Sequence, residues 1–145
     1  GYLELLKMQY TGCNPRGLML AFDKALSKKI LAYHRIPVPQ LTLFPKRHRF
    51  RRGVKYRYPL LVKPLFYEGS VGITQASVVH DEEHLIDRIE NIHRTFDDDA
   101  LAEQFIEGRE IYVGVLGNTR LETFTPWELV IENLPDGVPN IATKK

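Results

Sequence analysis

The sequence predicts an α/β fold of the α+β type, in which helices flank a mixed or antiparallel sheet. Two segments, around residues 18–33 and 82–96, repeat apolar residues at helical spacing. Short apolar runs with strand-like alternation are separated by turns that contain glycine or proline. The 145 residues, 43% hydrophobic and 26% charged, have the length and composition of one globular domain or slightly more.

The first part of the chain is expected to be largely helical. Residues 1–7 have the pattern of the end of a helix, and a short strand and turn are expected at 10–12. An amphipathic helix follows, with Leu18, Phe22, Leu26, Ile30 and Tyr33 on its apolar face and Lys24, Ser27 and Lys28 off that face. We expect this helix to be broken near Asp23 and to end before Pro37, since a residue that precedes proline disfavours helical geometry.

The middle of the chain carries the strands of the predicted sheet and a second helix. After an extended linker at 36–39, strands are expected at 41–44, 60–63 and 73–79. Asp81 is a suitable N-cap for the second helix. The apolar face of this helix comprises Leu85, Ile86, Ile89, Ile92 and Phe96.

Three consecutive aspartates, Asp97 to Asp99, follow the second helix. We interpret them as a solvated acidic turn rather than a metal site, because no second set of ligands lies at a suitable spacing. Further strands are expected at 101–106, 110–116 and 121–131, with a hairpin turn at Gly117-Asn118. Residues 135–145 have the composition of a loop.

Charge is unevenly distributed along the chain. The net charge is +2, but residues 46–57 hold seven Lys and Arg and no acid, and the other 13 basic and 18 acidic residues give −5. Because Phe50, Tyr56 and Tyr58 are interleaved, this basic segment is compatible with nucleic-acid binding. Such a segment more commonly forms a solvated loop or a short helix without a ligand, and we adopt that interpretation.

The sequence lacks the marks of several other protein classes. No apolar run reaches the roughly 18 residues of a membrane-spanning helix, and the N-terminus lacks the regions of a signal peptide. Cys13 is the single cysteine, so an intrachain disulfide is excluded, and neither CxxC nor a zinc-type Cys/His spacing is present. We therefore expect a cytoplasmic protein.

One motif suggests nucleotide binding. The apolar strand at 60–62 ends in Lys63-Pro64, and the loop Glu68-Gly69-Ser70-Val71-Gly72 follows. A strand that presents a lysine to a glycine-bounded loop can hold phosphates, because the ammonium is a point charge and glycines leave backbone N–H groups accessible. The same pattern also suits a buried strand that ends in a surface lysine, so the motif alone leaves both readings open.

Four segments together resemble the ATP-grasp superfamily, and most closely the D-alanine–D-alanine ligases and their relatives. They are FDKALSK at 22–28, LLVKP at 60–64, EGSVG at 68–72 and EQFIEGRE at 103–110. The resemblance covers nearly the whole chain and implies part of an ATP-grasp fold. It implies the tail of a preceding domain and a leading helix at 1–22, a central subdomain with the glycine loop at 23–103, and the start of the C-terminal subdomain at 104–145.

The resemblance implies which residues hold the nucleotide. Lys24 and Lys63 match the two lysines that hold the phosphates of ATP. Glu103 matches the carboxylate that accepts from the exocyclic amine of adenine, and Glu110 matches the residue that bonds the ribose hydroxyls. Backbone groups and apolar side chains of the intervening Gln104, Phe105 and Ile106 would hold the adenine ring.

The glycine loop matches the flexible lid that closes over the γ-phosphate. Its implied ATP-binding residues are Glu68, Gly69, Ser70 and Gly72, and Ser70 is also the residue to which we assign a catalytic role. The loop departs from the family pattern, which commonly has two serines after the first glycine. An additional residue, Tyr67, also precedes Glu68.

The implied reaction is that of an ATP-dependent carboxylate–amine ligase with an acyl-phosphate mechanism, as in peptidoglycan biosynthesis. Its partners would be ATP, Mg²⁺ and a small amino-acid or peptide substrate, and a homodimer is compatible with the family. The family's metal ligands lie downstream, so we expect them outside this chain: Glu132-Asn133 do not fit their spacing and Glu128 has no evident partner. By itself the chain is expected to supply the ATP-binding half-site and to be inactive.

Two alternatives remain open at this point. The chain is also compatible with a nucleotide-binding or regulatory domain that keeps Lys24, Lys63, Glu103 and Glu110 but lacks catalysis. The second alternative is a nucleic-acid-binding domain that uses the basic segment 46–57, for which a steep salt dependence would be the signature.

Overall fold

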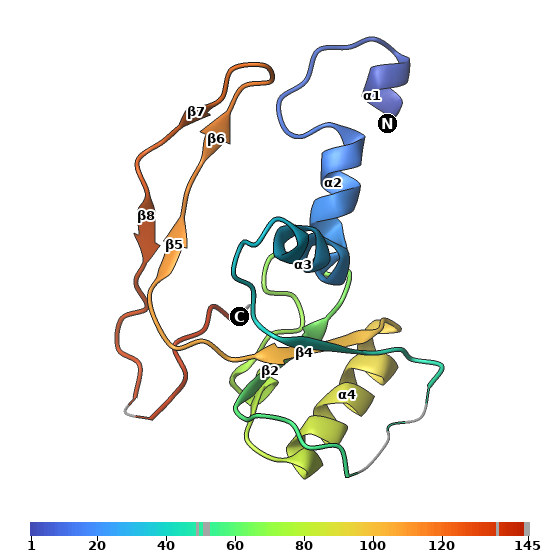
Figure 1. Ribbon diagram of the computed structural model, residues 1–145, viewed down its shortest axis with the longest axis vertical. Coiled ribbons are helices and arrows are strands. Elements are labelled where there is room, and N and C mark those ends of the chain that lie inside the picture. Colours follow the sequence, from blue (N-terminus) through green and yellow to red (C-terminus); the bar gives the residue numbers. More distant parts are fainter. Residues whose placement is uncertain (49, 51–52, 136, 144–145) are drawn as a thin grey trace. The chain divides into compact units, whose positions relative to one another are not determined.

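A four-stranded sheet organises the first part of the chain (Figure 1). The computed structural model describes residues 1–48, 50, 53–135 and 137–143. The strands are β1 (Leu41–Phe44), β2 (Leu60–Pro64), β3 (Val78–Val79) and β4 (Ala100–Gln104), in the spatial order β1-β4-β2-β3. β4 pairs antiparallel with both β1 and β2, and β2 pairs antiparallel with β3. The predicted α/β fold of the α+β type, with an antiparallel sheet and flanking helices, is confirmed.

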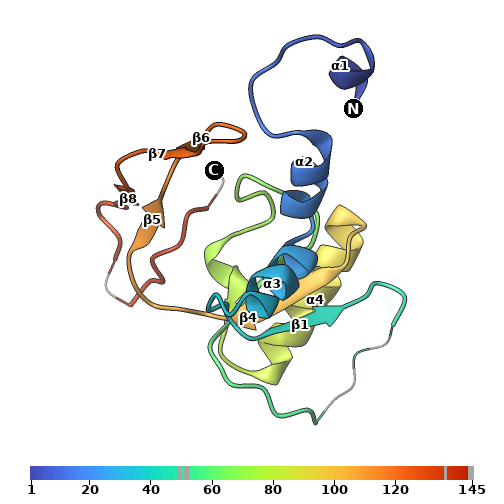
Figure 2. The ribbon, with the colours of Figure 1, turned by 45° about the horizontal axis from the view of Figure 1, so that its top comes forward.

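Two helices cover opposite faces of this sheet (Figures 1 and 2). α3 (Lys24–Tyr33) lies on one face, where Ala25 packs with Leu65 and Leu101. α4 (Glu82–Phe96) lies on the other face. The core there is formed by Leu60, Val62, Val79, Leu85, Ile89, Ile92, Ala100 and Ala102. Because side chains alternate along a strand, β2 directs Val62 to the α4 face and Lys63 to the α3 face.

α4 has the boundaries that the sequence predicts. The Asp81 carboxylate accepts a hydrogen bond of 2.9 Å from the backbone N–H of His84, which satisfies one of the free donors of the first turn. Glu82 and Glu83 place negative charge at the positive end of the helix dipole. The helix ends at Phe96, and its C-cap Asp97 adopts left-handed geometry with φ +54°.

The N-terminal helical region is divided as predicted. α1 (Tyr2–Leu5) and α2 (Pro15–Phe22) precede α3. Asp23 separates α2 from α3, and its carboxylate accepts from the Leu26 N–H at 2.9 Å, so the predicted break near Asp23 is the N-cap of a new helix. α3 ends at Tyr33, before Pro37, as expected.

α3 contacts the sheet through the side opposite to its apolar face. Leu26 and Tyr33 of the apolar face are 41% and 84% exposed, whereas Ala25 on the polar side is 4% exposed. The physical reason is that Lys24 and Lys28 find charged and carbonyl partners on the sheet side. Apolar periodicity identified the helix but not the face that is buried.

Two predicted strands in this part of the chain are wrong or too long. Residues 10–12 form a bend rather than a strand, and the Tyr10 hydroxyl donates to Glu4 Oε1 at 3.0 Å. The strand expected at 73–79 is reduced to β3, because Gln75–Ser77 form a 3₁₀ turn. Ser77 Oγ accepts from the Thr74 N–H at 2.9 Å, a local bond that competes with strand pairing.

Residues 106–142 form a second compact unit, and residues 1–105 with Thr143 form the first. Its strands are β5 (Glu110–Tyr112), β6 (Val115–Leu116), β7 (Glu122–Thr123) and β8 (Trp127–Leu129). β5 pairs antiparallel with β8 and β6 with β7, so this unit is a long, interrupted hairpin. Its strand residues are exposed or partly exposed, including Trp127 at 74%.

The hairpin turn at Gly117 is confirmed, whereas the two long strands around it are each interrupted. Gly117 has φ +119°, and an added Cβ would lie 2.0 Å from the Arg120 carbonyl oxygen. The predicted strand 110–116 breaks at Gly114, where the Phe124 ring would lie 3.2 Å from an added Cβ. The predicted strand 121–131 breaks before β8 at Pro126, which has no N–H to donate. The predicted strand 101–106 is shifted to Ala100–Gln104.

None of the helices in the described part of the chain has the length and apolar character needed to cross a membrane.

Truncation of Leu85 tests the core between α4 and the sheet. Leu85 is fully buried, so Leu85→Ala should lower the free energy of unfolding by about 2–5 kcal/mol. Leu18 in α2 is 57% exposed, and Leu18→Ala should change that free energy by less than about 0.5 kcal/mol. Urea unfolding followed by circular dichroism measures both. Equal losses would contradict the described core.

The Asp81–His84 pair predicts a pH effect. The hydrogen bond from His84 to the Asp81 carboxylate, followed by the charge of that carboxylate, raises the pKa of His84 above its ordinary value of 6.5. Because folding raises this pKa, the contribution to stability is complete below pH 6.5 and is lost as pH rises through the folded value. Asp81→Asn keeps a capping oxygen but removes the charge, so an NMR titration should show a lower pKa for His84 in that variant. An unchanged titration would refute the pairing.

Candidate functional site

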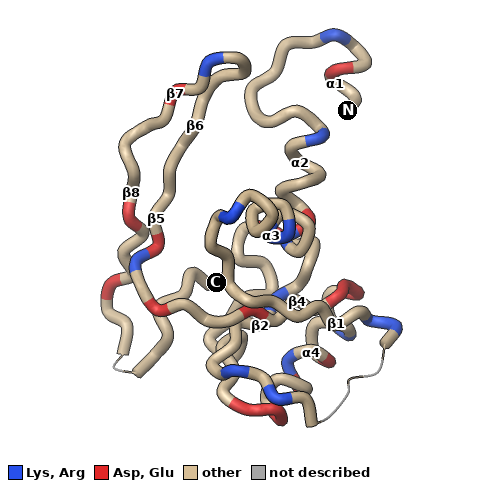
Figure 3. Tube along the Cα trace, in the orientation of Figure 1, with Lys and Arg blue, Asp and Glu red and all other residues tan. Residues whose placement is uncertain are grey.

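A buried carboxylate with two lysines forms the centre of the candidate site. Glu103 on β4 and Lys63 on β2 lie on the same face of neighbouring strands, and Lys63 Nζ donates to Glu103 Oε1. Lys28 on α3 places its Nζ 3.0 Å from Glu103 Oε2. The side chains of Glu103, Lys63 and Lys28 are only 7%, 13% and 19% exposed. Figure 3 shows the basic positions of α3 beside the strands β2 and β4.

Lys24 lies next to this cluster and contacts the start of the glycine loop. Its Nζ donates to the Leu65 carbonyl oxygen at 2.9 Å and to the Tyr67 carbonyl oxygen. Burial, and then the positive charge of Lys63, lower the pKa of Lys24. The structure therefore brings the two predicted phosphate-binding lysines together on one face of the sheet, with repulsion between them.

The glycine loop has the backbone geometry that its glycines require. Gly69 and Ser70 both have φ +60°, and the Val71 N–H donates to the Glu68 carbonyl oxygen at 3.2 Å, so the loop begins with a tight turn. Tyr67, the additional residue, is part of the loop's anchor. Its ring lies edge-on to Phe96 with centroids 5.2 Å apart, and its hydroxyl donates to the Phe96 carbonyl oxygen at 3.3 Å.

The far end of the glycine loop is fixed by α4. Arg88 donates from its guanidinium to the Gly72 carbonyl oxygen, and its side chain is half-buried, which lowers its pKa. Gly72 has φ +73°, and an added Cβ would lie 2.8 Å from both the Phe96 ring and Pro64. The loop is thus held at both ends, with Glu68, Gly69 and Ser70 between the anchors.

The predicted adenine-binding segment crosses from the first unit to the second. Glu103, Gln104 and Phe105 belong to the first unit, and Ile106 and Glu110 to the second. The Phe105 N–H already donates to the Pro59 carbonyl oxygen at 3.0 Å, so it is not free to bind a ring edge. Glu110 begins β5 and accepts a hydrogen bond from the Tyr112 hydroxyl.

One ion pair of the second unit is not indicated by the sequence. Glu128, for which the sequence shows no second metal ligand, places its Oε2 3.5 Å from Arg109 Nη1 within the second unit. The neighbouring strand register, Ile111 opposite Glu128, explains their proximity.

The three carboxylates of the acidic turn at 97–99 all bond to other groups of the protein. Asp98 accepts from the Phe66 N–H at 2.8 Å and Asp99 from the Lys46 N–H at 2.9 Å, while Asp97 pairs with the Lys46 ammonium. Lys46 of the basic segment is therefore tied to this turn. Arg49, Arg51 and Arg52 of the same segment lie outside the described residues.

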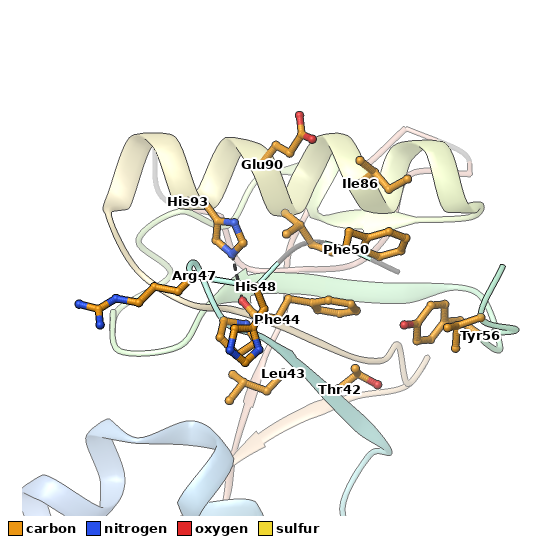
Figure 4. Close-up of a pocket in the computed structure, with 13 residues that line it drawn as sticks. Thr42, Leu43, Phe44, Arg47, His48, Phe50, Tyr56, Ile86, Glu90 and His93 are labelled. Atoms are coloured by element: carbon orange, nitrogen blue, oxygen red, sulfur yellow. Dashed lines mark hydrogen bonds between the residues drawn. The ribbon is translucent and has the colours of Figure 1, made fainter. Parts of the chain in front are cut away.

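A cavity of about 930 Å³ lies on the α4 side of the sheet (Figure 4). Phe44, Phe50 and Tyr56 line it together with residues of α4, among them His93, whose Nε2 lies 2.9 Å from the Phe44 carbonyl oxygen. It contains none of the predicted nucleotide-binding residues, so it is separate from the lysine and glutamate cluster.

Sequence reasoning missed two residues of the site, Lys28 and Arg88. Lys28 follows Lys24 by four residues, and this spacing alone places both on one face of a helix. Arg88 follows Leu85 by three residues, so it borders the apolar stripe of α4. Helical spacing is therefore a signal for both positions, but it does not reveal their partners.

Lysines from a helix and a strand, a buried carboxylate on the central strand and an anchored glycine loop define the class of this protein as an ATP-grasp domain. A sequence profile described as "D-ala D-ala ligase C-terminus" matches residues 32–139. The chain belongs to the D-alanine–D-alanine ligase family.

Individual relatives agree with this assignment. A D-alanine–D-alanine ligase of Syntrophotalea carbinolica is 41% identical over 116 residues, which are 80% of this chain and 36% of the relative. The solved D-alanine–D-alanine ligase of Coxiella burnetii matches with a TM-score of 0.75 and 28% identity over 90% of this chain and 39% of that one. The Bacillus anthracis enzyme, solved in complex with ATP, matches with a TM-score of 0.68 and 30% identity over 93% of this chain and 47% of that one. The chain spans about a third of the length of the curated relatives it matches.

Substitution of Gly72 tests the anchored end of the loop. Gly72→Ala should lower the free energy of unfolding by about 2–4 kcal/mol, because a left-handed alanine and an overpacked contact with Phe96 and Pro64 add together. Gly69 has a similar φ with no atom within 4 Å of an added Cβ, so Gly69→Ala should cost only about 1–2 kcal/mol. Thermal and urea unfolding measure the difference, and equal costs would show that the contact at Gly72 is not close.

Proposed function

We propose that this chain binds ATP and forms the nucleotide half-site of an ATP-dependent ligase that joins the carboxylate of one small amino acid to the amine of another. Family membership and the D-alanine–D-alanine ligase names of the relatives support this reaction class. The observation that carries the proposal is the convergence of Lys24, Lys63 and Glu103 on one face of the sheet.

The two lysines provide the positive charge that polyphosphate binding needs. Lys24 is half-buried and its pKa is lowered by burial and by the charge of Lys63, so two ammonium groups repel each other in a partly desolvated place. An anionic phosphate between them would remove that repulsion and gain charge-assisted hydrogen bonds. For this, Lys24 would leave the Leu65 and Tyr67 carbonyls and Lys63 would leave Glu103.

Glu103 provides the acceptor for the base. Its Oε2 is buried and receives no hydrogen bond of acceptable geometry from the described residues. Lys28 Nζ lies 3.0 Å from this oxygen, but the oxygen keeps a lone-pair position to which the exocyclic amine of adenine can donate. We expect Gln104, the side chain of Phe105 and Ile106 to hold the ring, and Glu110 to bond the ribose.

The glycine loop is proposed to close over the γ-phosphate. Both ends are fixed, by Lys24 and Tyr67 at the start and by Arg88 at Gly72, while Glu68, Gly69 and Ser70 lie between. We expect Ser70 to donate to the phosphate there. Closure of this segment would exclude water from the phosphorylated carboxylate.

Magnesium would neutralise phosphate charge in such a reaction. The described residues do not fit the metal, because no three His, Cys, Asp or Glu side chains among them are grouped to hold one. We therefore expect its ligands in the remainder of a longer protein.

Calorimetric titration with ATP tests the proposal. Lys63→Met should weaken ATP binding by about 10- to 100-fold, the range expected when a hydrogen bond to a charged group is lost. Lys29→Met, an exposed lysine of the same helix α3 as Lys24, is the matched control and should leave the affinity unchanged. Circular dichroism confirms that both variants are folded.

Equal affinity of Lys63→Met and the wild-type chain would refute a phosphate role for Lys63. Binding of ATP by a longer protein without amide formation from D-amino acids would instead favour a non-catalytic nucleotide-binding domain.

A further inference from the structure

Lys28 has a buried contact that the proposed function does not use. It extends from α3 to Glu103 on β4, with its Nζ 3.0 Å from Oε2, and both side chains are largely buried. On the same helix, Lys29 is exposed. A long lysine side chain loses conformational freedom when it is held in this way, so the contact needs a compensating interaction.

The charge balance around Glu103 provides that interaction. Lys63 contacts Oε1 and Lys28 contacts Oε2, so two cations flank one buried carboxylate. A buried carboxylate without a cation is strongly unfavourable. If Lys63 turns to the phosphates, as the proposed function requires, Lys28 is the cation that remains on Glu103.

The geometry at Oε2 leaves room for a further donor. Lys28 is close enough for an ion pair, yet Oε2 receives no hydrogen bond of acceptable angle from the described part of the chain. A carboxylate has about four lone-pair positions, so Oε2 can accept an N–H while it stays paired with Lys28. A base with a carbonyl oxygen at that place would instead meet a fixed negative charge.

We propose that Lys28 is a positioning residue that holds the Glu103 carboxylate in a fixed orientation, so that the site selects a nucleotide whose base carries an exocyclic amine. The inference rests on the proposed function, since it assigns Glu103 to the base and Lys63 to the phosphates. Lys28 acts through Glu103 and does not itself contact the nucleotide. Base selection therefore depends on a lysine one helical turn after the phosphate-binding Lys24.

The test compares two nucleotides that differ at the amine. Adenosine triphosphate and inosine triphosphate, which has a carbonyl oxygen in place of the amine, are titrated into the wild-type chain and the Lys28→Met variant. The wild-type chain should prefer the adenine nucleotide by at least about tenfold, the range of a hydrogen bond to a charged group. Lys28→Met should lose that preference through weaker binding of the adenine nucleotide alone.

Two further variants separate positioning from a general structural effect. Lys29→Met should retain the wild-type preference, and Lys28→Arg, which keeps the charge, should restore part of it. Inorganic tripolyphosphate should bind the wild-type chain and Lys28→Met equally, because it has no base. If Lys28→Met does not fold, the comparison is made between Lys28→Arg and Lys28→Gln.

The outcomes distinguish the two proposals. A wild-type chain that binds neither nucleotide overturns the proposed function, and the inference with it. If the wild-type chain binds both nucleotides, two results overturn the inference alone. In the first, Lys28→Met keeps the preference for the adenine nucleotide. In the second, Lys28→Met weakens the binding of both nucleotides equally.

Discussion

The buried carboxylate of Glu103, with its two lysine partners, is the constraint on which the arrangement of the first unit depends. It lies on the central strand of the sheet with its side chain 7% exposed, where an uncompensated charge would be strongly unfavourable. Compensation comes from β2 through Lys63 and from α3 through Lys28, so one residue links three elements. The same contacts place the cations of the site beside one another. The need to compensate the charge of Glu103 therefore shapes both the packing of these elements and the site.

The two faces of the sheet are held by different forces. The α4 face is apolar, with Leu85, Ile92 and Val62 fully buried, and its stability follows from removal of hydrocarbon from water. The α3 face is mixed, because buried Ala25, Leu65 and Leu101 lie there beside the charged side chains of Glu103, Lys63 and Lys28. A tightly packed layer under a charged layer suits a ligand site, because the scaffold stays rigid while the side chains above it exchange partners.

Much of this architecture is predictable from local signals. The N-cap Asp81, the helix break near Asp23, the strands β1 and β2, the face of α4 and the turn at Gly117 all follow from residue type and spacing. The orientation of α3 does not, because Leu26 and Ile30 mark an apolar face whereas Lys24 and Lys28 have their partners on other elements. The shortening of the strand expected at 73–79 depends on a local bond between Ser77 and Thr74, and the break at Gly114 depends on its packing against the Phe124 ring. Lys24, Lys63 and Glu103 were identified through a resemblance, and the pairing of Lys63 with Glu103 required the register of β2 against β4.

The exposed hairpin of the second unit has a consequence for how a protein of this family is made. Synthesis proceeds from the N-terminus, and domains generally fold as units in that order. Residues 1–105 contain a buried core of their own, so the lysines, Glu103 and the glycine loop can be in place while later residues are still being added. The apolar strands around Ile111 and Trp127 have no such core among the described residues. In a longer protein these strands would stay exposed until the residues that cover them have been synthesised.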